Sequence, residues 1–538
     1  NRQIVLAQKE DATDIQTIQA IAQANPVKGT IVDKNGEPLT GVSVVIKGTT
    51  SGTMSDLDGK FTLNAPVGST ITISYIGFLT QEIKLGENRD LMNITLQENA
   101  KELEAVVVVG FGTQKKESIT GAISAISGDD LMTTNAASTS TALAGKIAGI
   151  NSRQPDGRPG NGTSIRIRGM GTPLYVIDGV QKDEGQFNNI DPNNIESISI
   201  LKDASAAIYG VRAANGVVVV KTKGGRRDTK NTVNLTAYYG WQDFFKFPEP
   251  ADAKTYVAAK YQSDIIKKAA DPNFNMKYSA QDYQKWQQGT EKGYLGFDWY
   301  DFVINSAPMN YVGGNITGGS ENINYYLALS HLNQDAVIVN YGGFKRTNMQ
   351  MSIDANITKK LKLGGSMNGR IESRKNPGVP GGDDYWTALF AIYRNLPTIR
   401  PFANDNPKYP AKTSSNNSTN FAMLNYDLSG TYESTWRAIQ LNLSAEYEIM
   451  KGLNAKVLGG YYLADQVQSN HEFTYKLYRY DEATDTYPVE DSMDNPYMER
   501  TYEKVEETTG QFTLDFNRKF GSHNVAAVAG GEFIRRKT

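Results

Sequence analysis

Side chains that commonly perform catalysis or bind metals are scarce in this chain and far apart. The 538 residues include no cysteine and three isolated histidines, His331, His471 and His523. A chain without cysteine has no disulfides, thiolate zinc sites or cysteine nucleophiles. It also has no G-x-S-x-G or H-E-x-x-H motif. The sequence therefore predicts no enzyme and no catalytic, metal or cofactor site.

One acidic run resembles a calcium loop. Asp56-Leu57-Asp58-Gly59 places two carboxylates before a glycine, as metal loops do. Because no ligands follow at the remaining loop spacings, the run favours a hairpin turn instead.

Three glycine-rich runs, 157–162, 169–171 and 224–225, could in principle surround a phosphate. The second leads into Pro173 and a strand, so no helix N-terminus follows to hold a pyrophosphate. Ala144-Gly145-Lys146 also fails as a phosphate loop, because Ile147 stands where Ser or Thr is needed. We expect all of these runs to be structural loops that bind no phosphate.

The composition excludes some partners. The 56 basic and 58 acidic residues give a net charge of −2, which provides no electrostatic basis for binding nucleic acid. No apolar run reaches 18 residues, so a transmembrane helix is not expected. The chain starts at Asn1 without a signal sequence, and we expect any export signal to have been removed. Abundant Tyr and Gly suit strands and turns.

The N-terminal quarter divides into three parts. Residues 1–26 are interpreted as a domain remnant and a linker. Residues 27–98 contain six or seven short strands separated by turns, which predicts a β-sandwich. Residues 99–115 contain a β-branched run, Ala105–Phe111, flanked by charged residues and glycine. This run is either the last core strand of the sandwich or a detachable strand offered to another protein's sheet edge.

Residues 116–226 predict a mixed α/β unit. A helix is expected near 139–147, with strands at 164–168, 174–177, 195–201 and 216–221.

From residue 227 onward the chain shows long strands with strict alternation. One strand places Met349, Met351 and Ile353 on one face and polar residues on the other. We expect nine strands, near 231–241, 309–318, 322–332, 345–357, 361–372, 433–449, 453–465, 507–518 and 523–535. Their links alternate between long and short, which is typical of outer-membrane barrels and not of soluble sandwiches. Residues 227–538 are therefore predicted to be the first part of an antiparallel transmembrane β-barrel.

Nine is an odd number, whereas single-chain bacterial barrels have an even number of strands. The barrel is therefore not expected to close with this chain alone. Either the chain is a fragment, or another chain completes the barrel.

Four strings between residues 99 and 226 are similar to SusC-like TonB-dependent transporters of Bacteroidetes (SusC/RagA type). The strings are Val106–Lys116, Ser164–Gly169, Pro173–Val180 and Ile200–Val218. The resemblance implies a carboxypeptidase-regulatory-like domain at 27–98, a TonB-box segment at 99–115, a plug at 116–226 and a barrel of about 22 strands. Gln3–Leu6 resembles the end of a secretin/TonB N-terminal domain, which implies a signalling role and an anti-sigma regulator.

The resemblance also implies roles for individual residues. The TonB box would be Ala105, Val106, Val107, Val108, Val109, Gly110 and Phe111. Arg168 and Lys202 would lock the plug by pairing with barrel carboxylates, although an ordinary solvated charge or salt bridge fits them equally well. The plug loops 154–161, 170–172 and 183–187 would face the substrate, through Asp156, Gly157, Arg158, Asn161, Met170, Thr172, Asp183, Gln186 and Phe187.

The function so implied is TonB-dependent import of an oligosaccharide or peptide across the outer membrane. The expected partners are a SusD-like lipoprotein, TonB with its inner-membrane complex, the ligand and outer-membrane lipid. The plug and the sandwich would lie toward the periplasm. A passive porin or a surface adhesin is the alternative, but a porin needs no plug and an adhesin has no reason to sort its loops by length.

Overall fold

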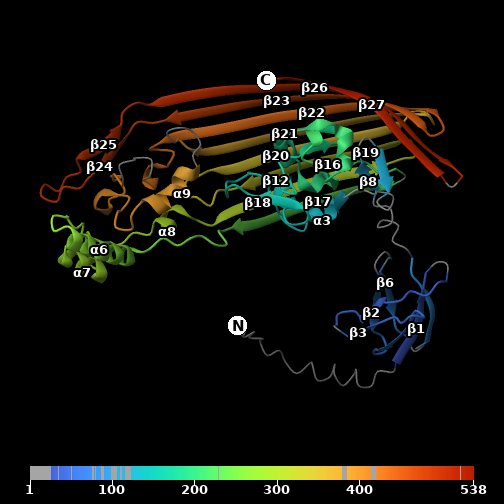
Figure 1. Ribbon diagram of the computed structural model, residues 1–538, viewed down its shortest axis with the longest axis horizontal. Helices are drawn as coiled ribbons and strands as arrows, with labels where there is room; N and C mark the ends of the chain where they lie inside the picture. The colour runs from blue at the N-terminus through green and yellow to red at the C-terminus, as the bar shows by residue number, and fades with distance from the viewer. Residues whose placement is uncertain are drawn as a thin grey trace. The chain divides into compact units, whose positions relative to one another are not determined.

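The computed structural model describes residues 26–33, 36–49, 51–75, 78, 80–86, 90–97, 106–109, 112–115, 123–227, 229–378, 385–413, 420–521 and 523–538. Two compact units are present. The first is a small N-terminal β-domain, and the second contains all described residues from 123 onward. Figure 1 shows the elements of both units.

The first unit contains seven short strands in two sheets, as the sequence predicts. One sheet has the order β4-β1-β7 and the other β3-β2-β5-β6. The strands are β1 (Pro26–Val32), β2 (Ser43–Ile46), β3 (Gly52–Met54), β4 (Lys60–Asn64), β5 (Thr70–Ser74), β6 (Gln81–Lys84) and β7 (Asp90–Thr95). Alternate residues such as Val44, Phe61 and Ile73 fill the core, which is the pattern of a sandwich.

The acidic run between β3 and β4 is a turn. The Asp56 carboxylate accepts hydrogen bonds from the backbone N–H groups of Asp58, at 3.0 Å, and Lys60, at 2.8 Å. These bonds stabilise the turn locally. Because β3 and β4 belong to different sheets, the turn joins the two sheets and does not close a hairpin.

The predicted plug region folds around a five-stranded sheet of order β10-β15-β16-β13-β14, in which β13 and β16 are parallel. A separate hairpin is formed by β11 and β12. The strands are β10 (Ile123–Ser127), β11 (Ile150–Arg153), β12 (Ser164–Ile167), β13 (Leu174–Ile177), β14 (Val180–Lys182), β15 (Ile195–Leu201) and β16 (Val217–Thr222). The helices are α3 (Gly128–Leu131), α4 (Thr139–Leu143), α5 (Glu184–Asn188), η2 (Pro192–Asn194), η3 (Ala204–Tyr209) and η4 (Val211–Ala213).

A single antiparallel sheet of nine strands forms the rest of the second unit, with neighbours in chain order apart from a small hairpin. The strands are β17 (Thr229–Gln242), β18 (Ala307–Gly319), β19 (Ile323–Gln334), β20 (Gly343–Asn356), β21 (Leu361–Pro377), β22 (Gly430–Met450), β23 (Leu453–Glu472), β26 (Tyr497–Phe520) and β27 (His523–Lys537). All nine predicted strands are confirmed. Strands β22, β23 and β26 are longer than predicted, at 21, 20 and 24 residues.

The long links gather at one end of the sheet and the short turns at the other (Figure 1). The long links hold α6 (Ala253–Ala270), α7 (Ala280–Gln288), α8 (Trp299–Val303), α9 (Tyr385–Arg394), η5 (Ala403–Asp405), η7 (Phe421–Met423) and the hairpin of β24 (Tyr475–Tyr478) and β25 (Val489–Met493). Side-chain capping explains where α6 and α7 start. Asp252 accepts from the Thr255 N–H, and Ser279 forms a capping box with Asp282.

The two faces of the nine-stranded sheet differ in chemistry. On β20, Met349, Met351 and Ile353 are exposed, while Gln350 is buried under the plug. The same alternation continues on β22, where Leu443 is 72% exposed and Asn442 is 8% exposed. One face is therefore apolar and uncovered, and the other is polar and covered by the plug. We call the covered face lumenal.

Candidate functional site: the boundary between plug and sheet

The segment expected to be the TonB box is described only in part. Val106–Val109 form β8, which pairs with β9 (Gly112–Lys115) in a two-stranded sheet. Among the described residues, β8 pairs with no strand of the sandwich, which argues against the core-strand interpretation. Ala105, Gly110 and Phe111 lie outside the described residues. The TonB-box assignment stays a prediction.

Two of the contacts between the plug and the lumenal face involve buried charged groups. The first, the β18–β20 contact, joins plug residues 189–194 to three neighbouring strands. Asp191, 2% exposed, accepts hydrogen bonds from the hydroxyls of Tyr311, at 2.8 Å, and Ser330. The Tyr326 hydroxyl donates to Asn194 Oδ1 at 2.9 Å. A buried carboxylate with several donors is well stabilised.

Strand β20 completes the β18–β20 contact through an arginine and an asparagine. Asn348 donates to the Asn189 carbonyl at 2.9 Å, and the Arg346 Nε donates to Asn348 Oδ1 at 2.9 Å. Arg346 is only 3% exposed and its Nη1 also reaches Asn189 Oδ1 at 3.4 Å. The plug segment is thus held by side chains whose alternating positions point them inward.

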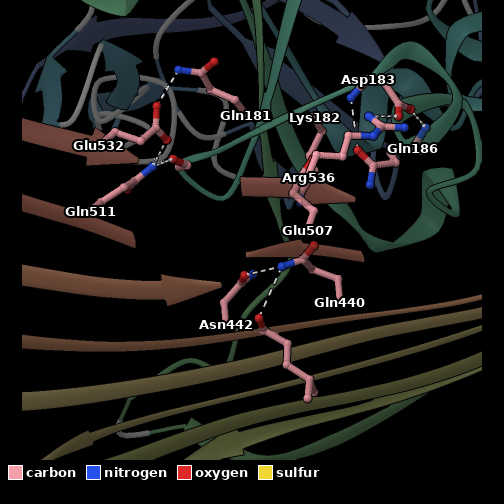
Figure 2. A network of polar contacts seen from close by, with 12 residues as sticks. Gln181, Lys182, Asp183, Gln186, Gln440, Asn442, Glu507, Gln511, Glu532 and Arg536 are labelled. Atoms are coloured by element: carbon pink, nitrogen blue, oxygen red, sulfur yellow. Dashed lines mark hydrogen bonds and ion pairs between the residues drawn. The ribbon is translucent and has the colours of Figure 1, made fainter. Parts of the chain in front are cut away.

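The second place, the β26–β27 contact, joins plug residues 179–183 to the last two strands (Figure 2). Lys182 Nζ lies 2.8 Å from Glu507 Oε1, with both side chains under 10% exposed. Gln181 donates to Glu532 at 2.6 Å, and Gln511 donates both to Glu532, at 2.6 Å, and to the Gly179 carbonyl, at 2.8 Å. At the edge, the half-exposed Asp183 and Arg536 lie 3.6 Å apart.

Burial makes the Lys182–Glu507 pair sensitive to the loss of either partner. Burial lowers the pKa of Lys182, and the hydrogen bond and charge of Glu507 oppose that shift. The ammonium also lies 5.2 Å from the centroid of the Tyr462 ring, where the ring face attracts a cation. Removing one charge would leave the other buried and unpaired.

The residues expected to lock the plug take other positions. Lys202 donates to Ser124 Oγ at 2.7 Å and to the Ala148 carbonyl, both within the plug. Burial and the nearby Arg168 charge lower the pKa of Lys202. Arg168 is exposed. No ion pair with a sheet carboxylate is present for either residue among those described, so their locking role stays a prediction.

The loop 154–161, expected to face the substrate, lies near the long-link ends of the strands. Asp156 accepts from Asn161 Nδ2 at 2.8 Å, and Arg374 of β21 donates to Asn161 Oδ1 at 3.1 Å. The Arg158 guanidinium lies 5.3 Å from the Tyr385 ring centroid. A side chain at Gly157 would meet Phe244 and Tyr385. This loop is therefore packed between the strands and the long links.

The other two loops expected to face the substrate, 170–172 and 183–187, differ in how exposed their residues are. Met170 and Thr172 are exposed, and the Thr172 carbonyl accepts from Asn215 at 3.2 Å. Asp183 is the N-cap of α5 and forms a capping box with Gln186, which is 8% exposed. Phe187 is fully buried and stacks on Tyr175 with ring centroids 4.7 Å apart. The expectation that Phe187 faces the substrate is wrong, because the short helix turns it into the plug core.

The cavities between the plug and the lumenal face include two that adjoin each other at Thr222 and Asn442. The smaller, of about 80 Å³, is bordered by Lys182, Gln186, Gln440 and Tyr462. The larger, of about 720 Å³, lies toward the short turns and is bordered by Lys223, Ser352 and Ser444. A third, of about 1000 Å³, lies among the long links and is lined by aromatic residues including Phe244, Phe297 and Trp299.

Within the described residues, no group of three or more His, Cys, Asp or Glu side chains could hold a metal ion. No helix in the same part of the chain is long and apolar enough to span a membrane.

Family models match two parts of the chain. Residues 115–217 match the TonB-dependent receptor plug domain. Residues 27–108 match the CarboxypepD_reg-like domain. Both matches agree with the regions that form the plug and the sandwich.

Curated relatives match most of the chain. A TonB-dependent receptor of Formosa agariphila is 34% identical over 396 residues, covering 72% of this chain and 37% of the relative. TonB-dependent receptor SusC of Bacteroides thetaiotaomicron is 32% identical over 434 residues, covering 74% and 40%. The chain therefore spans less than half the length of these relatives.

The fold also resembles a solved structure. The RagAB peptide importer in its "open-open" state superposes with a TM-score of 0.61 at 22% identity, covering 80% of this chain and 49% of that chain. A plug held on the polar face of a strand wall defines the class of plugged β-barrel receptors. Over the length that it spans, the chain belongs to the SusC-like TonB-dependent receptor family.

Proposed function

We propose that this protein imports a nutrient across the outer membrane, with the energy supplied through TonB. The observation that carries the proposal is the plug, which is hydrogen-bonded to the lumenal face of a sheet whose other face is apolar and exposed. An exposed apolar face of this size suits lipid. A wall whose lumen is occupied needs an energy-coupled step before a solute can pass.

TonB coupling is assigned to residues 105–111. The β conformation of Val106–Val109 supports the assignment, because strand addition relies on main-chain hydrogen bonds. Deleting residues 105–111 is expected to abolish uptake of the nutrient while ligand binding and heat-modifiable gel mobility are unchanged. An equally long deletion at 10–16 serves as the control. Uptake at the wild-type rate after deletion of 105–111 would contradict the coupling role.

A SusD-like lipoprotein is proposed to cover the long-link end. The structural neighbour titled as the RagAB peptide importer and the relative named SusC support this partner. The aromatic cavity among the long links offers a surface for the lipoprotein or for its ligand. Purification in mild detergent should recover the lipoprotein in near-equal amounts. Recovery of the receptor alone would count against the pairing.

The nutrient is proposed to be an oligosaccharide or a peptide. The exposed plug loops with Met170 and Thr172, and the loop 154–161, are proposed to face it. The signalling role and its anti-sigma regulator depend on residues 1–25, outside the described residues, and stay predictions. Identifying by mass the ligand that co-purifies with the receptor would decide between the two nutrient classes.

A further inference from the structure

The outer face of the nine-stranded sheet has an uncharged stretch of limited height. On β22 the outward side chains of this stretch are Ile439, Leu441, Leu443, Ala445, Tyr447 and Ile449. From the first to the last, the strand rises about 33 Å, which for a tilt of about 40° is a height of about 25 Å. Outer-membrane barrels have an apolar band of this height. We call this stretch, with its neighbours on the other strands, the apolar band.

Charged residues begin where the apolar band ends on the side of the long links. The first outward charged residues on β21, β22, β23, β26 and β27 are Lys375, Arg437, Asp465, Glu506 and Arg535. Their register positions shift toward the short turns from β21 to β27 and never shift back. A membrane plane that crosses tilted strands traces such a slanted line. The line therefore fits the boundary between hydrocarbon and lipid headgroups.

Basic residues outnumber acidic ones beyond this line on the last two strands. What we call the outer basic patch consists of Arg500, Lys504, Arg535 and Lys537, all exposed. The last two face outward because Arg536 between them faces the plug, where it pairs with Asp183. One acidic residue, Glu506, lies among the four, 2.6 Å from the Lys504 ammonium and in register with Lys537. Four positive charges against one leave an excess of three.

The neighbouring strands do not neutralise this excess. Arg437 and Asp465 lie 3.3 Å apart, and Lys375 and Glu433 lie 2.9 Å apart, so the charges on β21–β23 are paired with each other. Neither arginine of the outer basic patch forms an ion pair with another residue in the described part of the chain. The patch is therefore a local concentration of positive charge at the edge of the apolar band.

Aromatic side chains adjoin the outer basic patch. Tyr502 lies between its first two members on β26, and Phe533 lies next to Arg535 on the side of the apolar band, with both rings exposed. Aromatic residues favour the level of the headgroups in a membrane. At the short-turn end of β26 and β27, Arg518 is the one outward Lys or Arg within the described residues. The two ends of these strands therefore present different surfaces to lipid.

We propose that the outer basic patch binds the headgroup of a lipid that carries phosphate monoesters, with the acyl chains on the apolar band. A phosphate monoester has about −1.5 to −2 charges at pH 7, so it neutralises more of the excess than the single charge of a phosphodiester. Clustered Lys and Arg bind such headgroups. A lipid contacts both the patch and the band, whereas a free anion contacts only the patch. This inference goes beyond import and rests only on the proposed membrane placement of the outer face.

The test measures lipid binding to the purified full-length receptor in detergent by native mass spectrometry. The probe is diphosphoryl lipid A, whose headgroup carries two phosphate monoesters. Arg535→Gln is expected to raise its dissociation constant about fivefold, and Arg535→Gln with Lys537→Gln about thirtyfold, because each basic residue contributes to holding an anionic headgroup. Both side chains are exposed, so heat-modifiable gel mobility should be unchanged.

Three comparisons isolate the cause. Arg518→Gln removes one charge from the short-turn end of the same strand and should change the dissociation constant by less than about twofold. Arg535→Lys with Lys537→Arg keeps both charges and should stay within about threefold of the unmodified receptor. Phosphatidylglycerol has a single phosphodiester charge and should bind the unmodified receptor about tenfold more weakly than lipid A.

Each of these measurements either supports the site or overturns it. Unchanged binding of lipid A in the double glutamine variant would overturn the site, and equal losses in Arg518→Gln and Arg535→Gln would overturn its location. Equal affinity for both lipids would overturn the preference for monoesters. A large excess of inorganic phosphate should leave lipid A bound, and its displacement would overturn a lipid as the occupant. Because no readout involves transport, the 105–111 deletion tests the import proposal separately.

Discussion

The two faces of the nine-stranded sheet are built from the same strands, yet they meet different surroundings. On the outer face, Leu329, Ile353 and Leu443 are exposed to between 46% and 72%. On the lumenal face, Ser330, Asn348 and Gln350 are under 10% exposed and contact the plug. Because side chains switch faces at every residue, one pattern of alternation provides both a lipid-compatible surface and a polar seat for the plug.

The comparison shows that burial and polarity are reversed relative to a soluble sheet. The covered face is the polar one, and several of its side chains form hydrogen bonds with plug groups. Apolar residues, by contrast, form the uncovered face. Each hydrogen bond on the lumenal side can therefore be removed by a substitution that leaves the outer face unchanged.

The largest expected effect comes from placing a charge on the outer face. Leu443→Arg should cost about 2–4 kcal/mol if the residue lies near the bilayer midplane, because lipid cannot hydrate the guanidinium. Ser444, one residue away, borders the larger cavity between the plug and the sheet, so Ser444→Arg should fold nearly normally. Ile353→Arg and Ser352→Arg form a second pair. Folding yield into vesicles, followed by heat-modifiable gel mobility, measures both pairs.

A smaller loss of stability is expected when the buried Asp191 carboxylate loses one hydrogen-bond donor. Tyr311→Phe removes a donor to the buried Asp191 carboxylate and should lower stability by about 1.5–3 kcal/mol. Urea unfolding of the purified receptor gives the difference. An unchanged midpoint would mean that the β18–β20 contact does not hold the plug.

A neutral hydrogen bond in the same contact should matter less. Tyr326→Phe removes the donor to Asn194 and is expected to cost about 0.5–1.5 kcal/mol. The same urea titration compares it with Tyr311→Phe. A larger loss for Tyr326 than for Tyr311 would contradict the importance assigned to the Asp191 charge.

The smallest effect is expected at the half-exposed edge of the β26–β27 contact. Arg536→Gln breaks the 3.6 Å pair with Asp183 and should cost about 0–1 kcal/mol, since water and salt screen this pair. Raising the salt concentration should reduce the difference further. A loss of stability as large as that of Tyr311→Phe would mean that the Asp183–Arg536 pair stabilises the plug as much as the Tyr311–Asp191 hydrogen bond does.

Much of the fold was predictable because it depends on local periodicity. The strict alternation of Met349, Met351 and Ile353 with polar residues predicts both the strand and its faces, and all nine strands are confirmed. The long links were less predictable. Helices α6 and α7 carry capping signals at Asp252 and Ser279, but the weakly patterned polar sequence between the long strands predicts only loops.

The contacts of the plug could not be read from spacing. Lys182 and Glu507 are 325 positions apart, and only the placement of β14 against β26 brings them together. At Phe187 the sequence gives a wrong expectation about burial. Its neighbours Gly185 and Asn188 suggest an exposed loop, yet the capping box at Asp183 starts a short helix that buries the ring on Tyr175.

The separation of the two faces can be measured directly with single cysteines, which this chain lacks naturally. A fluorophore is attached at Leu443→Cys or at Ser444→Cys in the full-length receptor, with any cysteine outside these 538 residues replaced by serine. After reconstitution with brominated lipid, its quenching reports contact with acyl chains. The account predicts strong quenching at Leu443 and little at Ser444, with the same contrast between Ile353→Cys and Ser352→Cys. Equal quenching within each pair would contradict a lipid-facing outer face and a lumenal plug seat.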